Sequence, residues 1–210
     1  MNKTVLAASA AIAITPFAHA DLVDGGFESY NAYGYSFFSG TDPHYGWATT
    51  APDNTLEIWS NWTEGIQAYE GNNFAELNAN YASTLYQDVT GLPSSSSVNW
   101  HFAHHGRWGN DTMRLTITDL GLDNVYGTSD DATLYSSLFT AGTSQWEVHY
   151  GSVETIGNNT RFAFEAVSAA GGPTIGNLID YCGFGVNEVP APGSISLLAV
   201  GGLISRRRRR

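Results

Sequence analysis

Apolar and polar side chains alternate in several short runs of this chain. Residues 113–118 alternate strictly, and the same period of two recurs in residues 146–150 and 161–166. Successive side chains of a β-strand point to opposite faces of its sheet, so each run has one buried face and one wet face. The pattern predicts an all-β domain in which two facing antiparallel sheets enclose an aromatic-rich interior.

Segments rich in Gly, Asn, Ser and Pro separate these runs. These residues favour turns, because each either accepts or imposes a turn conformation of the backbone. Residues 30–53 are aromatic and contain Gly but show no clear period, which favours long loops at one end of the sandwich. We expect turns at residues 93–97, 106–110, 121–131, 157–159 and 171–173.

Residues 1–20 have the three parts of a secretory signal peptide. A basic residue, Lys3, precedes an Ala-rich apolar run, and the segment ends at Ala18-His19-Ala20. A small residue on either side of a variable one is the pattern that signal peptidase accepts. We therefore expect export and a mature chain that begins near Asp21.

The C-terminal residues 189–210 combine a Pro-rich motif, an apolar segment at 194–205 and five arginines at 206–210. Twelve residues of helix span about 18 Å, less than the roughly 30 Å of a hydrocarbon core, so we expect only transient contact with the membrane. The arrangement resembles the PEP-CTERM sorting signals that exosortase-type transpeptidases recognise in Gram-negative bacteria, although Ala191 stands where Glu is usual. This resemblance implies a location at the cell surface or in the extracellular matrix. A basic patch for nucleic acid is the alternative for the arginines.

Residues 21–188 form one expected domain with a strongly acidic balance. Only Arg107, Arg114 and Arg161 remain as cations against all twenty acidic residues, so this part carries a formal charge of −17. Such a charge opposes nucleic acid and anionic lipid as partners and suits divalent cations or neutral ligands. A single cysteine, Cys182, cannot form an internal disulfide, so we interpret it as a buried thiol.

Five segments resemble, in their order and spacing, the strands of the galactose-binding-like jelly roll. They are residues 22–28, 69–78, 84–89, 102–107 and 176–180. The resemblance implies a two-sheet antiparallel jelly-roll sandwich in which the first and last strands lie side by side. That fold is shared by many carbohydrate-binding modules.

The same resemblance implies a calcium ion where the first and last strands meet. Glu28 and Asp180 would supply carboxylates, Gly26 a backbone carbonyl, and the turn that contains Asn72 a further oxygen. Calcium prefers six to eight hard oxygen ligands, and a clamp between terminal strands would stabilise a domain without disulfides. The alternative is that Glu28 accepts hydrogen bonds from backbone N–H groups of a turn and that Asp180 caps a sheet edge.

Two other clusters of polar residues are candidates for metal sites, but their spacing does not match known metal-binding patterns. Residues 119–131 are rich in Asp and Gly but do not match the EF-hand pattern, which favours a solvated hairpin loop. His101 and His105 would share one face of a strand while His104 points to the other, and the spacing is not that of a zinc site.

The residue types present also fit a binding site for sugars. Aromatic rings stack on the C–H faces of sugars, and planar polar side chains bind the hydroxyls. The alternative for each tryptophan is a place in the core, and for Arg107 an ion pair with a nearby acid. The candidate platforms are Trp59, Trp62 and Tyr86, and the candidate polar residues on the non-core face of the middle strands are Glu76, Asn78, Gln87, His105 and Arg107.

These observations predict a non-catalytic, calcium-stabilised module that binds a polysaccharide or other glycan at the cell surface or in the matrix. One alternative is a structural surface or biofilm-matrix protein without a small ligand. A glycan-acting hydrolase is the other, since carboxylate pairs such as Glu57 and Glu64, or Glu70 and Glu76, could serve hydrolysis. The sequence contains no Gly-x-Ser-x-Gly elbow and no phosphate-binding glycine loop.

Overall fold

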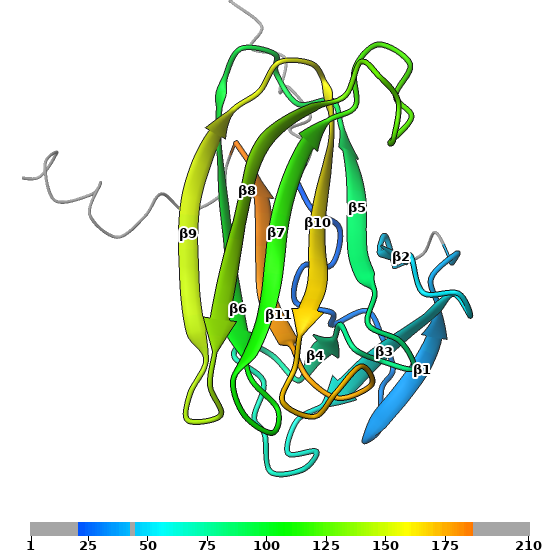
Figure 1. Ribbon diagram of the computed structural model, residues 1–210, viewed down its shortest axis with the longest axis vertical. Helices are drawn as coiled ribbons and strands as arrows, with labels where there is room; N and C mark the ends of the chain where they lie inside the picture. Colours follow the sequence, from blue (N-terminus) through cyan, green and yellow to red (C-terminus); the bar gives the residue numbers. More distant parts are fainter. Residues whose placement is uncertain (1–20, 43–44, 187–210) are drawn as a thin grey trace, which may run out of the picture.

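The computed structural model describes residues 21–42 and 45–186, and their regular elements are eleven β-strands in two antiparallel sheets (Figure 1). The six-stranded sheet contains, in spatial order, β1 (Tyr35–Ser39), β3 (Thr55–Ser60), β4 (Asn73–Glu76), β11 (Leu178–Gly185), β6 (Ser97–His105) and β9 (Glu147–Glu154). The five-stranded sheet contains β2 (Ala48–Thr49), β5 (Thr84–Thr90), β10 (Asn159–Ser168), β7 (Asp111–Asp119) and β8 (Ala132–Ala141). The predicted two-sheet antiparallel sandwich of the jelly-roll class is confirmed.

Side chains from both sheets pack into one core between them. In β7 the alternate residues Met113, Leu115 and Ile117 are fully buried, and in β10 Phe162 and Phe164 are as well. In β7 the polar residues between them point outward, as the period of two predicts. Each such apolar side chain contributes about 1.5 to 3 kcal/mol when it is fully buried.

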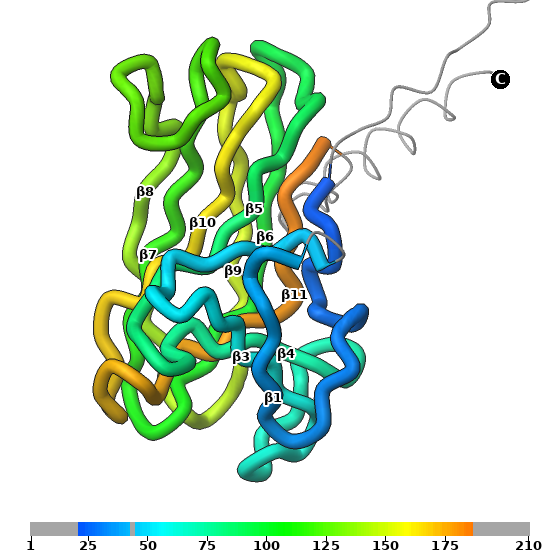
Figure 2. The backbone as a smooth tube through the Cα atoms, turned by 90° about the vertical axis from the view of Figure 1, so that its right-hand side faces the viewer, coloured from blue at the N-terminus to red at the C-terminus, as the bar shows by residue number. Residues whose placement is uncertain are grey.

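The segment 22–28 was expected to form the first strand, and this prediction is wrong. The segment does lie beside β11, where the N–H of Cys182 donates to the carbonyl of Gly25 at 2.9 Å (Figure 2). Asp24 and Phe27 have positive φ angles of 51° and 60°, which a regular strand does not contain. A Cβ on Gly25 would lie 1.8 Å from the Cys182 carbonyl oxygen, so only glycine allows this close approach.

Residues 30–53 were expected to be long loops, but they contain the short strands β1 and β2. β1 pairs with β3 along its whole length, with Tyr35 opposite Trp59. Aromatic side chains lie on both faces of β1, since Phe37 is exposed and Phe38 packs against the core. The two faces therefore do not differ in hydrophobicity, and no period of two is visible in the sequence.

The turn predictions at residues 106–110, 121–131 and 171–173 are confirmed, because these segments connect β6 to β7, β7 to β8 and β10 to β11. The signal-peptide and sorting-signal predictions concern residues 1–20 and 189–210, which lie outside the described residues. In the described part of the chain, no helix is long and apolar enough to cross a membrane.

Candidate functional site

The outer face of the six-stranded sheet carries a second layer of large side chains. In β3, Leu56 and Ile58 belong to the main core, so the alternate residues Glu57 and Trp59 point away from it. The loop at 61–72 folds over this outer face. It covers a small apolar cluster of Trp59, Ala68, Phe74 and Leu178.

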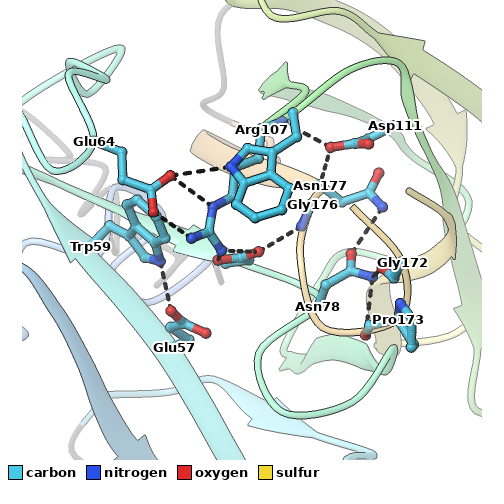
Figure 3. Close-up of polar contacts among 12 residues, drawn as sticks. Glu57, Trp59, Glu64, Asn78, Arg107, Asp111, Gly172, Pro173, Gly176 and Asn177 are labelled. Carbon is cyan, nitrogen blue, oxygen red and sulfur yellow. Dashed lines mark hydrogen bonds and ion pairs between the residues drawn. The ribbon is translucent and has the colours of Figure 1, made fainter. Parts of the chain in front are cut away.

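Arg107 organises the polar groups above this cluster. Its Nη1 donates to both carboxylate oxygens of Glu76, at 3.1 and 3.0 Å, while Nε and Nη2 donate to Glu64 at 3.2 and 2.7 Å (Figure 3). The guanidinium carbon lies 4.4 Å from the ring centroid of Trp59 and 5.5 Å from that of Trp108. Two carboxylates and two aromatic rings therefore hold one cation.

Glu57 and Glu76 face each other across the β3–β4 pair, and both are almost fully buried. Glu57 accepts a hydrogen bond from the indole N–H of Trp59 at 3.0 Å, as Figure 3 shows. Burial and the neighbouring Glu57 raise the pKa of Glu76 to about 7, although Arg107 opposes this shift. Burial likewise raises the pKa of Glu57. The face therefore holds more carboxylates than its single cation neutralises.

Two clefts open on either side of the Arg107–Glu64 ion pair, and both are lined by these two residues. The larger cleft has a volume of about 510 Å³ and the smaller one about 320 Å³. We refer to the two clefts together as the groove. The larger cleft is lined by Glu64, Gly65, Ile66, Gln67, His105, Arg107, Trp108, Thr143, Ser144, Gln145 and Trp146, and the smaller one by Tyr35, Phe37, Glu57, Glu64, Ala79, Asn80, Arg107, Thr174 and Ile175.

The exposed aromatic side chains of the groove were missed in the sequence. Trp108 is 60% exposed beside the larger cleft, and Tyr35 and Phe37 are 58% and 51% exposed beside the smaller one. Two signals were available in the sequence. Trp108 directly follows Arg107, and Tyr35 and Phe37 are two positions apart, so they lie on the same face of a strand. They were overlooked because Trp108 lies in a turn and β1 has aromatic residues on both faces.

Four of the residues proposed from the sequence for sugar binding lie at the groove or beneath it. His105 and Arg107 line the larger cleft, whereas Glu76 and Trp59 are buried in contact with Arg107 and line neither cleft. Trp59 therefore has no face open to solvent. Trp62 is 67% exposed on the covering loop and lines neither cleft.

The other three proposed residues lie elsewhere. Tyr86 and Gln87 belong to β5 in the five-stranded sheet, where Arg161 lies 3.8 Å above the Tyr86 ring. The Gln87 amide binds the backbone of Val23 through two hydrogen bonds, at 2.9 and 2.6 Å. Asn78 is buried and accepts a hydrogen bond from Asn177 at 3.0 Å. The expectation that Gln87 shares the non-core face of the middle strands with Glu76 is wrong, because the distance between them along the chain does not reveal which sheet each residue joins.

The residues expected to bind calcium surround one turn, residues 69–73. Glu28 Oε1 accepts hydrogen bonds from the N–H groups of Asn72 and Asn73, at 2.7 and 2.8 Å. Asp180 Oδ2 accepts from two further N–H groups of the same turn, at 2.8 and 3.1 Å. Residues distant in sequence therefore converge here, with the carboxylates acting as acceptors for backbone donors.

The cluster contains carboxylate oxygens, the type of donor that calcium prefers. A third carboxylate, that of Glu70, lies against Gly26, since a Cβ there would be 2.7 Å from its oxygen. Burial raises the pKa of Asp180 to about 8, and burial together with Glu28 raises that of Glu70. Within residues 21–42 and 45–186, however, no three His, Cys, Asp or Glu side chains are close enough to hold one metal ion.

The other residues singled out in the sequence lie in the interior or in a loop. Burial lowers the pKa of His104 to about 3, and its Nε2 lies 3.1 Å from Asn177 Oδ1. Burial raises the pKa of the Cys182 thiol, which is a free, buried cysteine as predicted. In the loop at 120–131, Asp130 and Asp131 accept hydrogen bonds from backbone N–H groups at 2.7 Å.

Several solved carbohydrate-binding domains resemble this chain at low sequence identity. No protein-family profile and no curated protein matches the chain. The C-terminal family 22 carbohydrate-binding module of Clostridium thermocellum Xyn10B is similar over 75% of this chain and 97% of that module, with 16% identity and a TM-score of 0.49. A xylan-binding domain of Paenibacillus barcinonensis Xyn10C covers 73% and 95%, with 12% identity and a TM-score of 0.48. A cellulose-binding domain of Cellulomonas fimi β-1,4-glucanase C covers 76% and 97%, with 11% identity and a TM-score of 0.43.

Proposed function

We propose that the protein is a non-catalytic carbohydrate-binding module whose groove binds a glycan chain. The observation that carries this proposal is the combination, in one groove, of exposed aromatic rings with planar polar side chains. Trp108 adjoins Gln67 and Gln145 in the larger cleft, and Tyr35 adjoins Asn80 in the smaller one. This combination serves sugars, because the rings contact C–H faces and the amides bind hydroxyls.

The arrangement favours an extended chain over a single sugar. Both clefts are lined by Arg107 and Glu64, so they adjoin at this ion pair. A chain that crosses the sheet would contact an aromatic residue on each side of the pair. Arg107 is fixed by four hydrogen bonds and stacked between rings, so little conformational entropy is lost when a ligand packs against it.

Export and calcium binding belong to the same proposal. The signal peptide at residues 1–20 and the sorting signal at 189–210 would deliver the module to the cell surface or matrix, after processing by signal peptidase and a sorting transpeptidase. Calcium would be held by the carboxylates of Glu28 and Asp180, the Gly26 carbonyl and an oxygen of the turn that contains Asn72. The support is that both acids bind this turn and that neither takes part in an ion pair among the described residues.

A binding screen tests the proposed function. The purified protein is incubated with insoluble and soluble polysaccharides, and depletion from solution is measured for the wild type and for Trp108→Ala, Tyr35→Ala and the double variant. Loss of one stacked aromatic residue costs about 1 to 3 kcal/mol, so we expect affinity to fall about 5- to 100-fold.

Tyr126→Ala is the matched control, because Tyr126 is 52% exposed and lies over Arg161 on the outer face of the other sheet. It should bind like the wild type. Failure of the wild type to bind any polysaccharide would overturn the proposal in favour of a structural matrix protein. Release of new reducing ends, lost in Glu57→Gln, would instead identify a hydrolase.

A further inference from the structure

The groove and the layer beneath it hold more carboxyl groups than cationic groups. Glu57 and Glu64 line the clefts and Glu76 is buried against Arg107, which is the single cation among these residues. Arg107 already makes four hydrogen bonds to two of these carboxylates, so it has little capacity left for an anionic ligand.

Glu57 is the carboxylate that this cation leaves unpaired. It lines the smaller cleft, is 6% exposed, and has no ion pair among the described residues. The Trp59 indole N–H, at 3.0 Å, is the one hydrogen-bond donor that the described structure gives it. A buried carboxylate with a single neutral donor is costly, and burial raises its pKa accordingly. A cationic donor in the smaller cleft would remove this cost.

His105 is a second buried polar side chain at the groove. It is more than nine-tenths buried, lines this cleft, and packs against Trp146 with ring centroids 5.2 Å apart. Its Nδ1 has no hydrogen-bond partner among the described residues. Burial lowers the pKa of His105. An imidazole beside an indole offers a sugar a polar edge next to an aromatic ring.

We propose that the groove selects glycans whose sugars carry free, protonated amino groups, and that Glu57 is the acceptor for one of these ammonium groups. This inference rests on the proposed function and names the class of glycan. An ammonium donates three hydrogen bonds, and a charge-assisted hydrogen bond to a carboxylate is roughly twice as strong as a neutral one. Residues 21–188 carry a formal charge of −17, which attracts a cationic chain and repels one built from uronic acids.

Titration calorimetry at about pH 6 tests the inference with four soluble oligosaccharides of equal length. These are a fully deacetylated β-1,4-glucosamine oligomer, its N-acetylated counterpart, a cello-oligosaccharide and an oligogalacturonate. We expect the deacetylated oligomer to bind at least about tenfold more tightly than the neutral ones, and the galacturonate to bind weakest. Glu57→Gln should reduce the preference for the amine to about twofold or less.

Glu165→Gln is the matched control, since it removes the same charge from the outer face of the other sheet, where Glu165 pairs with Arg114. It should keep the preference for the amine. An oligolysine of equal charge reports non-specific attraction and should bind at least tenfold more weakly than the glucosamine oligomer.

The outcomes separate this inference from the proposed function. Equal binding of amino and N-acetyl oligomers would overturn the inference and leave the module's function intact. An unchanged preference in Glu57→Gln, or equally tight binding of oligolysine, would also overturn it. If no saccharide binds, both proposals fail.

Discussion

The guanidinium of Arg107 lies 4.4 Å from the ring centroid of Trp59 and covers it. Trp59 is fully buried, so its indole supports the arginine instead of presenting a face to solvent. The exposed aromatic surface of the groove is therefore provided by other residues, of which Trp108 and Tyr35 are the most exposed.

The ion pair of Arg107 with Glu76 should be important for stability. The two side chains are 10% and 0% exposed. Removal of one partner from a buried pair leaves the other charge unpaired, so Arg107→Ala should lower the free energy of unfolding by about 3 kcal/mol. Urea denaturation at pH 8, where Glu76 is mostly ionised, measures this change.

Arg114→Ala provides the comparison, since the Arg114–Glu165 pair is largely exposed, at 39% and 45%. Its cost should be below about 1 kcal/mol. Equal costs for the two substitutions would show that burial does not strengthen the Arg107 pair.

Stability should fall as pH rises through neutrality because of Glu76. Its folded-state pKa, about 7, lies above the ordinary value of 4.5, so the folded state holds the proton more tightly than the unfolded chain. This contribution is fully present below pH 4.5 and is lost as pH rises through about 7, by on the order of 2 to 3 kcal/mol. The raised pKa of Glu57 acts in the same direction, and the lowered pKa of Glu64 acts in the opposite one.

Unfolding free energies at pH 5, 6, 7 and 8 for the wild type and Glu76→Gln isolate this effect. The variant should show a flatter dependence on pH. Parallel curves would mean that Glu76 does not titrate in this range.

Gln87 should hold the N-terminal segment of the domain in place. Its amide makes two hydrogen bonds to the backbone of Val23, and each such bond contributes about 1 kcal/mol. Gln87→Ala should lower the free energy of unfolding by about 1 to 2 kcal/mol and accelerate hydrogen exchange at the Val23 amide. Asn158→Ala, at an exposed side chain, should do neither.

Calcium should raise the thermal stability of the protein. A ligand at about a hundred times its Kd stabilises by about 2.7 kcal/mol, which corresponds to a Tm increase of about 5 to 10 °C for a domain of this size. Asp180→Asn should abolish this increase, whereas Asp130→Asn in the β7–β8 loop should keep it. A Tm that is unaffected by calcium and chelator, with no heat in titration calorimetry, would exclude the site.

The sequence by itself determined the fold class and the separators between strands. Strict alternation in residues 113–118 and 161–166 identified β7 and β10, because one face of each is buried and the other is wet. The same local signal could not reveal β1, whose two faces are both aromatic. It also did not indicate that residues 22–28 contain positive φ angles and form no regular strand.

Only the tertiary structure decided which residues share the groove. β4, β11 and β6 are neighbours in one sheet, in that order, so Glu76 comes close to Arg107, which follows β6. Gln87 belongs to β5 in the other sheet and lies away from both. The burial of Trp59 depends on the loop at 61–72, which folds over the sheet and brings Glu64 to Arg107. Such contacts join residues more than thirty positions apart, and neither periodicity nor motif spacing records them.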